Sequence, residues 1–285
     1  MQTTNWHNYT YTHHNNGHHT VVGTVKVARG IESPQLDNRR DILVYLPPSY
    51  ERSDRRYPVL YMHDGQNLFD NATSYAGEWR VDETMESLSR EEGLEAIVVG
   101  IPNMGVRRLD EYSPFVVPRY GGGLGDLYLA FMVNSLKPLI DSHFRTRPEK
   151  QHTGIMGSSM GGLISLYAFF RYPTVFGFAG VMSPSLWFAQ GAIFPYVEAA
   201  SFHPGKIYLD AGTREFGESW PEVVTLRTHS RRYYGRVRHL KRVLARKGYQ
   251  PVRDLLHVEG RGANHNEAAW AERFPQAIRF FLLGK

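Results

Sequence analysis

The stretch that decides the fold reads "HTGIMGSSMGGLISLYAFF" and covers residues 152–170. A short apolar segment leads through glycines and two serines into an apolar run with helical character. Gly157 to Gly161 fit the pattern G-x-S-x-G, in which a serine occupies a strained turn between a strand and a helix and needs nearly bare neighbours. The stretch therefore predicts a nucleophilic Ser159, with Ser158 only filling the turn. A glycine-rich turn without chemistry is the alternative.

Apolar runs of similar length recur along the chain and predict further strands. They begin near residues 20, 41, 58, 95, 153, 176, 206 and 255. The middle runs are continuously hydrophobic, which is typical of parallel strands covered on both faces, and helical patterns separate them. We therefore expect an α/β protein with a doubly wound, mostly parallel sheet of about eight strands and helices on both faces.

Length and composition fit one globular domain. The chain has 285 residues, of which 42% are hydrophobic and 21% charged, as in ordinary folded proteins. No repeat or linker divides it, so we expect a single domain over residues 20–285. Residues 1–19 form a histidine-rich segment that we expect to be a flexible lead-in rather than a metal site, because nothing fixes the geometry of its imidazoles. These histidines are His7, His13, His14, His18 and His19.

Charge and residue usage exclude several classes of site and partner. The sequence has no cysteine, which excludes disulfides, thiolate metal sites and cysteine nucleophiles. A net charge of +5 is mild and is only a weak indication of a nucleic-acid partner. The first residues do not follow a secretory-signal pattern, and no apolar run approaches the ~18 residues needed to span a bilayer. We expect a cytoplasmic protein without a membrane or nucleic-acid partner; the oligomeric state stays open.

A serine hydroxyl needs a base and an orienting carboxylate to react at neutral pH. When a G-x-S-x-G serine serves as nucleophile in this architecture, the acid and then the histidine follow it, each in a loop after a later strand. His265 lies in the loop before the last helix, whereas His257 lies within a predicted strand, so His265 is the predicted base. Glu215, in a loop, and Asp210, at a strand end, both remain candidates for the acid, and the loop position favours Glu215.

Two backbone amides are the expected oxyanion hole. One belongs to Met160, and the other to Gln66 in the turn after the strand that starts near residue 58. Gly65 lets the Gln66 amide approach a substrate closely. His63 and Asp64 precede it without a third metal ligand nearby, so a hydrogen-bonded turn is the expectation. We expect neither a metal nor another cofactor.

Four ordered motifs resemble the "putative esterase" family of α/β-hydrolases. They are "RRDILVYLPPSYERSDRRYPVLYMHDGQNLFD" from residue 39, the stretch from residue 152 continued to "SPSLWF", "KIYLDAGTREF" from 206 and "ANHNEAAW" from 263. That family includes esterase D (S-formylglutathione hydrolase), feruloyl esterases, enterochelin-type siderophore esterases and mycolyltransferases. The resemblance covers about residues 20–283 and implies the α/β-hydrolase fold and serine esterase activity.

The resemblance also assigns site residues. The family's acid closes a G-T-x-D/E segment, which implies Glu215 here. The amides of Gln66 and Met160 match the family's oxyanion donors. The family has a glycine immediately before its catalytic histidine, whereas Asn264 precedes His265 in this sequence.

Substrate-contacting residues are less well defined. Aromatic side chains in the loops after predicted strands are candidates for a wall around an acyl or aryl group, with core packing as the alternative. They are Trp79, Tyr112, Phe115 and Trp187. Arg107 and Arg108 are candidates for binding an acidic or catecholate ester, with solvated loop arginines as the alternative. We expect hydrolysis of a small-molecule carboxylic ester through an acyl-enzyme, with acyl transfer and the identity of the ester left open.

A basic helix at residues 230–249 suggests a different class, a non-catalytic binding protein with the same fold. Its eight lysines and arginines would suit an anionic partner. However, an apolar stripe at helical spacing leaves those cations on a solvated outer face. The stripe consists of Tyr233, Val237, Leu240 and Leu244.

Overall fold

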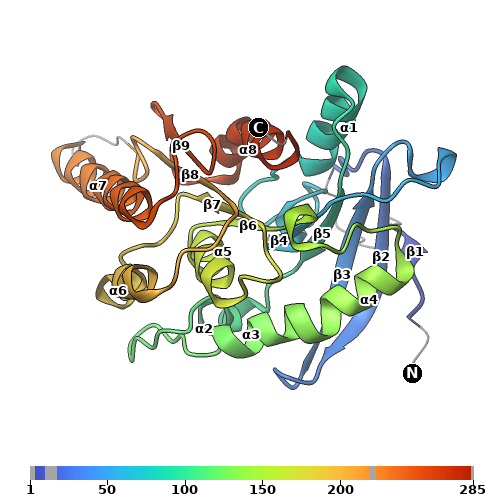
Figure 1. The fold of residues 1–285 in the computed structure, drawn as a ribbon, viewed down its shortest axis with the longest axis horizontal. Helices are drawn as coiled ribbons and strands as arrows, with labels where there is room; N and C mark the ends of the chain where they lie inside the picture. Colours follow the sequence, from blue (N-terminus) through green and yellow to red (C-terminus); the bar gives the residue numbers. More distant parts are fainter. Residues whose placement is uncertain (1–3, 10–17, 218–222, 284–285) are drawn as a thin grey trace.

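A nine-stranded sheet forms the centre of the computed structural model, with the strand order β1-β2-β3-β5-β4-β6-β7-β8-β9 (Figure 1). The structure describes residues 4–9, 18–217 and 223–283. The strands are β1 (His7–Asn8), β2 (Thr24–Ser33), β3 (Asn38–Leu46), β4 (Val59–His63), β5 (Ile97–Ile101), β6 (Thr153–Ser158), β7 (Phe178–Met182), β8 (Lys206–Gly212) and β9 (Leu255–Gly260). The pairs from β5 to β9 are parallel, whereas β1, β2 and β3 pair antiparallel.

The expected fold class is confirmed, and the strand count is corrected from about eight to nine. The additional strand is β1, whose two polar residues pair with Val27 and Lys26 of β2. A two-residue polar strand carries no hydrophobic pattern, so the sequence gives no signal for it. His13 and His14 of the expected lead-in lie outside the described residues.

Helices cover both faces of the sheet (Figure 1). They are α1 (Val81–Glu92), α2 (Arg108–Glu111), α3 (Gly125–Phe131), α4 (Lys137–His143), α5 (Met160–Arg171), α6 (Ile193–Ala199), α7 (Val223–Lys247) and α8 (Glu267–Leu282). On β4, Val59 and Tyr61 pack into the core on the side of α3 to α7, and Leu60 and Met62 pack into the core on the side of α1 and α8. Because β4 is buried on both sides, its sequence is continuously apolar rather than alternating.

Two helices bear on the sequence predictions. In α5, the residues from Met160 to Phe170 are all buried, as in a helix enclosed on every side. In α7, the four residues of the predicted apolar stripe are buried, whereas Arg231, Arg238 and Lys241 are exposed, so the predicted stripe is confirmed. Within the described ranges, no helix combines the length and the apolar character that crossing a membrane requires.

Candidate active site

Ser159 occupies the turn between β6 and α5, so the strand and helix expected on either side of it are present. Its φ of 57° and ψ of −119° lie in a region that residues with a side chain rarely adopt. The flanking glycines allow close packing: a Cβ on Gly157 would lie 2.9 Å from His63 Cδ2, and one on Gly162 would lie 2.9 Å from the Met182 carbonyl oxygen. The turn therefore needs glycine at position 157, which begins the motif, and at position 162, which directly follows it.

The backbone of Ser159 is held against the end of β7. Its amide donates to the carbonyl oxygens of Met182 at 3.0 Å and Ser183 at 3.1 Å, and the amide of Ser185 donates to the carbonyl oxygen of Ser159 at 2.9 Å. Ser159 Oγ lies 3.1 Å from Ser185 Oγ. These contacts fix the position of the hydroxyl relative to the loop that follows β7.

The structure brings His265 and Glu215 together. His265 Nδ1 lies 2.5 Å from Glu215 Oε2. The other carboxylate oxygen accepts hydrogen bonds from Ser183 Oγ at 2.7 Å and from the Gly212 amide at 2.5 Å. The Glu215 side chain is 0% exposed and that of His265 is 27% exposed. A buried, fully hydrogen-bonded carboxylate thus holds one imidazole nitrogen and leaves the other available.

Asp210, the alternative acid, has different partners. It is fully buried, and its carboxylate accepts from Arg273 Nε at 2.7 Å and from the Ser183 amide at 3.0 Å. Burial raises the pKa of Asp210, although Arg273 acts in the opposite direction. Of the two carboxylates that the sequence left open, Glu215 is the one in contact with His265.

Hydrogen bonds connect the three candidate residues across neighbouring strands. Ser159, Ser183, Glu215 and His265 follow β6, β7, β8 and β9, which are adjacent and parallel, so all four lie at the carboxyl edge of the sheet. The connection runs from the Ser159 amide to the Ser183 carbonyl, from Ser183 Oγ to Glu215, and from Glu215 to His265. Among the described residues, no hydrogen bond joins Ser159 Oγ to His265 directly; such contacts are often long in ligand-free enzymes.

Two residues that support this edge, Ser183 and Tyr233, carry no catalytic signal in the sequence. Ser183 is fully buried, and its carbonyl oxygen accepts from Tyr233 OH at 2.5 Å. The Tyr233 ring also lies edge-on to the His265 ring, with centroids 5.6 Å apart. The sequence pattern places Tyr233 only in the apolar stripe of α7. Its hydroxyl at a stripe position was the available signal, since a buried tyrosine usually finds a hydrogen-bond partner.

The turn after β4 packs against the start of α5. A Cβ on Gly65 would lie 2.6 Å from Gly100 C and from Ile101 N in β5, so only glycine fits there. A Cβ on Gly161 would lie 3.3 Å from His63 Cβ. The turn that carries Gln66 and the turn that carries Met160 are therefore neighbours.

Both expected oxyanion amides belong to residues at the start of a helical turn. Met160 is the first residue of α5, where an N–H has no acceptor within the helix and the helix dipole favours negative charge. Gln66 lies in a short 3₁₀ turn, and its side-chain Oε1 accepts from the Asn103 amide at 3.2 Å. This hydrogen bond connects the Gln66 side chain to the loop after β5.

Arg108 forms an ion pair with Asp64 in the turn after β4. Arg108 Nε and Nη2 donate to the two carboxylate oxygens at 2.7 Å and 2.8 Å, and Asn103 Nδ2 donates to Oδ1 at 2.7 Å. Burial alone would raise the pKa of Asp64, but Arg108 and Asn103 bring it below its ordinary value. Arg108 is thus engaged within the protein, whereas its neighbour Arg107 is exposed.

The four aromatic candidates have different environments. Trp79 is 3% exposed and packs against Trp270, with ring centroids 5.7 Å apart, and Tyr112 is 0% exposed. The structure therefore places both in the core, the alternative weighed for them. Phe115 is half-buried against other aromatic rings, and Trp187, in the loop after β7, is 42% exposed.

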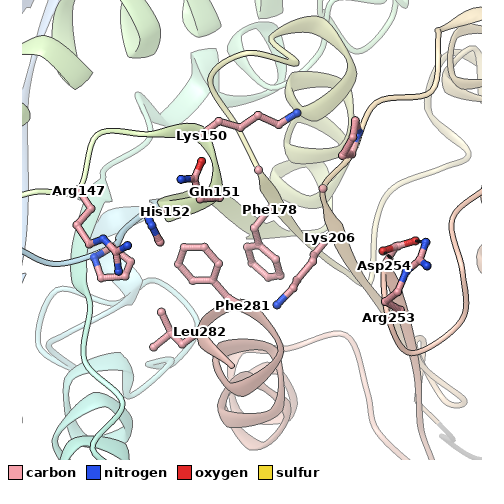
Figure 2. Close-up of a pocket in the computed structure, with 14 residues that line it drawn as sticks. Arg147, Lys150, Gln151, His152, Phe178, Lys206, Arg253, Asp254, Phe281 and Leu282 are labelled. Carbon is pink, nitrogen blue, oxygen red and sulfur yellow. Dashed lines mark hydrogen bonds and ion pairs between the residues drawn. The ribbon is translucent and has the colours of Figure 1, made fainter. Parts of the chain in front are cut away.

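A cavity of about 630 Å³ lies at the opposite, amino edge of the sheet (Figure 2). Its lining includes His152, Phe178 and Lys206, which stand at the amino ends of β6, β7 and β8. Arg147 and Lys150 make it cationic. None of the candidate catalytic residues lines it, so it is separate from the candidate active site.

The sequence matches the family described as "Putative esterase" over residues 33–281. The chain belongs to this esterase family. The enzyme class expected from the sequence, an esterase, is thereby confirmed. The match includes every residue of the candidate active site, from the turn after β4 to the loop that carries His265.

Known relatives of this esterase include proteins of both assigned and unassigned activity. YbbA, an uncharacterized protein of Bacillus subtilis (strain 168), is 29% identical over 266 residues, which are 90% of this chain and 98% of YbbA. A siderophore triacetylfusarinine C esterase of Aspergillus fumigatus is 32% identical over 137 residues, which are 46% of this chain and 44% of that protein. The siderophore hydrolase EstA of Aspergillus nidulans shares the fold, with a TM-score of 0.72 at 19% identity over 92% of this chain and 95% of EstA.

Proposed function

We propose that this esterase is a serine carboxylesterase in which Ser159 is the nucleophile, His265 the general base and acid, and Glu215 the orienting carboxylate. The observation that carries the proposal is the contact between His265 Nδ1 and the buried Glu215, at the same sheet edge as the strained Ser159 turn. A carboxylate on Nδ1 fixes the tautomer that exposes a basic Nε2 and stabilises the imidazolium that forms.

In the proposed reaction, the hydrogen bond between Ser159 Oγ and Ser185 Oγ breaks. The Ser159 hydroxyl then gives its proton to His265 Nε2 and attacks the ester carbonyl. The amides of Met160 and Gln66 donate to the oxyanion as it develops. The imidazolium then protonates the departing alcohol, which leaves an acyl group on Ser159. A water molecule, deprotonated by His265, hydrolyses the acyl-enzyme and restores the serine.

The proposed substrate is a small-molecule carboxylic ester of the siderophore or hydroxycinnamate kind. Relatives named as siderophore esterases and as a feruloyl esterase support this class. The exposed Trp187 supports it as well, since it follows Ser185 by two residues and offers an aromatic surface. We also propose that the enzyme hydrolyses its ester rather than transferring the acyl group. It acts in the cytoplasm, and residues 20–285 form a single domain.

Hydrolysis of p-nitrophenyl acetate tests the proposal. We expect Ser159→Ala to lower kcat by about 10⁴-fold or more, because the nucleophile cannot be replaced by its neighbours. Ser158→Ala, in the same turn, is the matched control and should retain most of the activity. A fluorophosphonate should add its mass to the peptide that contains Ser159. Substantial turnover by Ser159→Ala, or labelling at another serine, would contradict the mechanism.

A further inference from the structure

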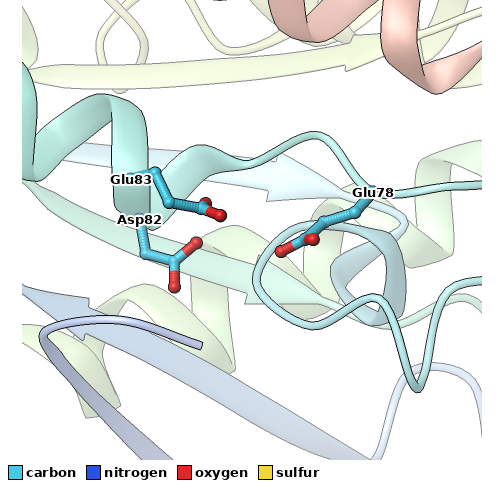
Figure 3. Close-up of side chains that lie close together, drawn as sticks. All are labelled: Glu78, Asp82 and Glu83. Atoms are coloured by element: carbon cyan, nitrogen blue, oxygen red, sulfur yellow. The ribbon is translucent and has the colours of Figure 1, made fainter. Parts of the chain in front are cut away.

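Three carboxylates outside the candidate active site converge where the loop after β4 enters α1 (Figure 3). They belong to Glu78, Asp82 and Glu83, and one oxygen from each lies within 4.8 Å of the other two. Figure 3 shows the carboxylates of Asp82 and Glu83 pointing toward that of Glu78. The sequence pattern predicts no role for these residues.

Each of these carboxylates has one oxygen satisfied by the protein. Asp82 Oδ2 accepts from the Val22 amide at 2.7 Å, and Glu78 Oε2 accepts from Thr20 Oγ1 at 2.8 Å. Glu83 Oε1 accepts from Arg80 Nε at 3.3 Å. Asp82 and Glu78 are therefore tied to the segment that leads into β2.

The second oxygen of each carboxylate is buried and has no hydrogen-bond partner in the part of the chain that the structure describes. These oxygens are Glu78 Oε1, Asp82 Oδ1 and Glu83 Oε2. Asp82 is 0% exposed, so water from the bulk solvent does not satisfy its free oxygen. Buried polar groups in native proteins are rarely left without a partner. Three such oxygens within one carboxylate cluster indicate a missing ligand that accepts electron pairs.

The charge of the cluster indicates a cation. The Arg80 side chain that contacts Glu83 is 66% exposed, so it offsets the negative charge only weakly. Three ionised carboxylates this close together repel one another, so a bound cation would stabilise the ionised cluster.

We propose that Glu78, Asp82 and Glu83 bind a hard divalent cation, with Ca²⁺ the best fit. An all-oxygen set of carboxylate ligands suits Ca²⁺, Mg²⁺ or Mn²⁺ rather than zinc or copper. Ligand oxygens spread over as much as 4.8 Å fit opposite sides of an ion bound at about 2.4 Å, the distance that Ca²⁺ prefers. Water molecules complete the coordination.

The ion has a route to this site and a structural role there. A cavity of about 490 Å³ between α1 and α8 is lined by Glu78 and Glu83 and gives the ion and its waters access. The loop that carries Glu78 is joined to the turn of Gln66, because the amide of Trp79 donates to the Asn67 carbonyl at 2.8 Å. The cation therefore ties the entry to β2, the start of α1 and this loop together.

Thermal unfolding of the full chain, treated with EDTA and then titrated with CaCl₂, MgCl₂ or MnCl₂, tests the site. With Ca²⁺ at about 100 times its Kd, we expect Tm to rise by about 4–5 °C. Isothermal titration calorimetry should give about one ion per chain. If none of the three cations raises Tm or binds at millimolar concentration, the carboxylates share protons instead and the proposal fails.

Substitutions assign the effect to this cluster. Asp82→Asn should abolish the Ca²⁺-dependent rise in Tm, and without metal it should be at least as stable as the wild type because one buried charge is gone. Glu83→Gln, at a ligand more exposed than Asp82, should also abolish the rise in Tm. This variant tests the site if Asp82→Asn does not fold. Glu91→Gln, which lines the same cavity outside the cluster, should keep the full response. A response retained by Asp82→Asn or Glu83→Gln would overturn the assignment.

Discussion

His265 is attached to Glu215 at two points, although 50 positions separate them in the chain. The side-chain Nδ1 contacts Oε2 at 2.5 Å, and the backbone amide of His265 donates to the Glu215 carbonyl oxygen at 3.1 Å. The two contacts join the loop after β8 to the loop after β9. The orientation of the imidazole therefore depends on the acidic residue both through its side chain and through its backbone.

Glu215→Gln should lower kcat by about 10³- to 10⁴-fold with little change in Tm. A glutamine side chain still accepts from Ser183 and Gly212, but it cannot hold His265 in the required tautomer or stabilise the imidazolium. Ester hydrolysis rates and thermal unfolding of the same preparations measure both effects.

Asp210→Asn is the matched comparison and should give the reverse pattern. It leaves the Arg273 guanidinium without a buried counter-charge, so we expect a loss of about 3 kcal/mol in the free energy of unfolding. The activity of each folded molecule should stay near that of the wild type. A stable but inactive Asp210→Asn, together with an active Glu215→Gln, would exchange the two assignments.

Gly65→Ala should impair both folding and turnover. The added methyl group would meet backbone atoms of β5 at 2.6 Å, so the turn that presents Gln66 must move. Gly235→Ala in α7 is the opposite case, because nothing lies within 4 Å of a Cβ there and alanine favours the helix by about 0.5–1 kcal/mol. Denaturant unfolding and hydrolysis rates should separate the two variants; equal behaviour would refute the steric argument.

Arg108→Ala should destabilise the protein, whereas Arg107→Ala should not. Removal of Arg108 leaves the buried Asp64 without its bidentate partner, and we expect a loss of about 2 kcal/mol, because the pair is partly exposed. Arg107 is exposed, so its removal should leave Tm unchanged and should raise KM only for anionic esters. An Arg107→Ala variant with altered Tm, or an Arg108→Ala variant with unaltered Tm, would contradict this division.

Acid should destabilise the protein partly through His63. Burial lowers the pKa of this histidine from 6.5 to about 3, so the unfolded chain binds a proton more tightly than the folded chain. The contribution of His63 to stability is therefore complete above pH 6.5 and is lost as the pH falls toward 3, by up to about 1.4 kcal/mol per pH unit. Denaturant unfolding between pH 7 and pH 4 measures this dependence.

His63→Gln should flatten that pH dependence even if it lowers stability overall. His143→Gln, at an exposed position on α4, is the control and should keep the wild-type profile. Parallel curves for the wild type and His63→Gln would show that other groups account for acid unfolding.

Local pattern was sufficient to predict the layered sheet, and it also supplied the candidate site residues, whose catalytic roles stay a prediction. The strand–turn–helix around Ser159 and the position of His265 before α8 depend on short segments, in which glycines and apolar runs carry strong signals. Without the resemblance, the choice between Glu215 and Asp210 stayed open. The ion pair between Asp210 and Arg273 joins residues 63 positions apart, so no local pattern indicates it.

Tertiary packing decided what local pattern left open. Trp79 follows a loop and resembles a candidate binding-wall residue, but Trp270, distant in sequence, buries it. Glu78, Asp82 and Glu83 have the sequence pattern of ordinary charges around a helix start. Their convergence, and the contacts of Glu78 and Asp82 with Thr20 and Val22, appear only in the folded chain.

The separation of the two edges of the sheet has a practical consequence. The amino edge carries Arg147, Lys150 and Arg253 around a cavity, while the proposed chemistry takes place at the carboxyl edge. A label placed at the amino-edge cavity would therefore leave the proposed reactive edge open to the medium.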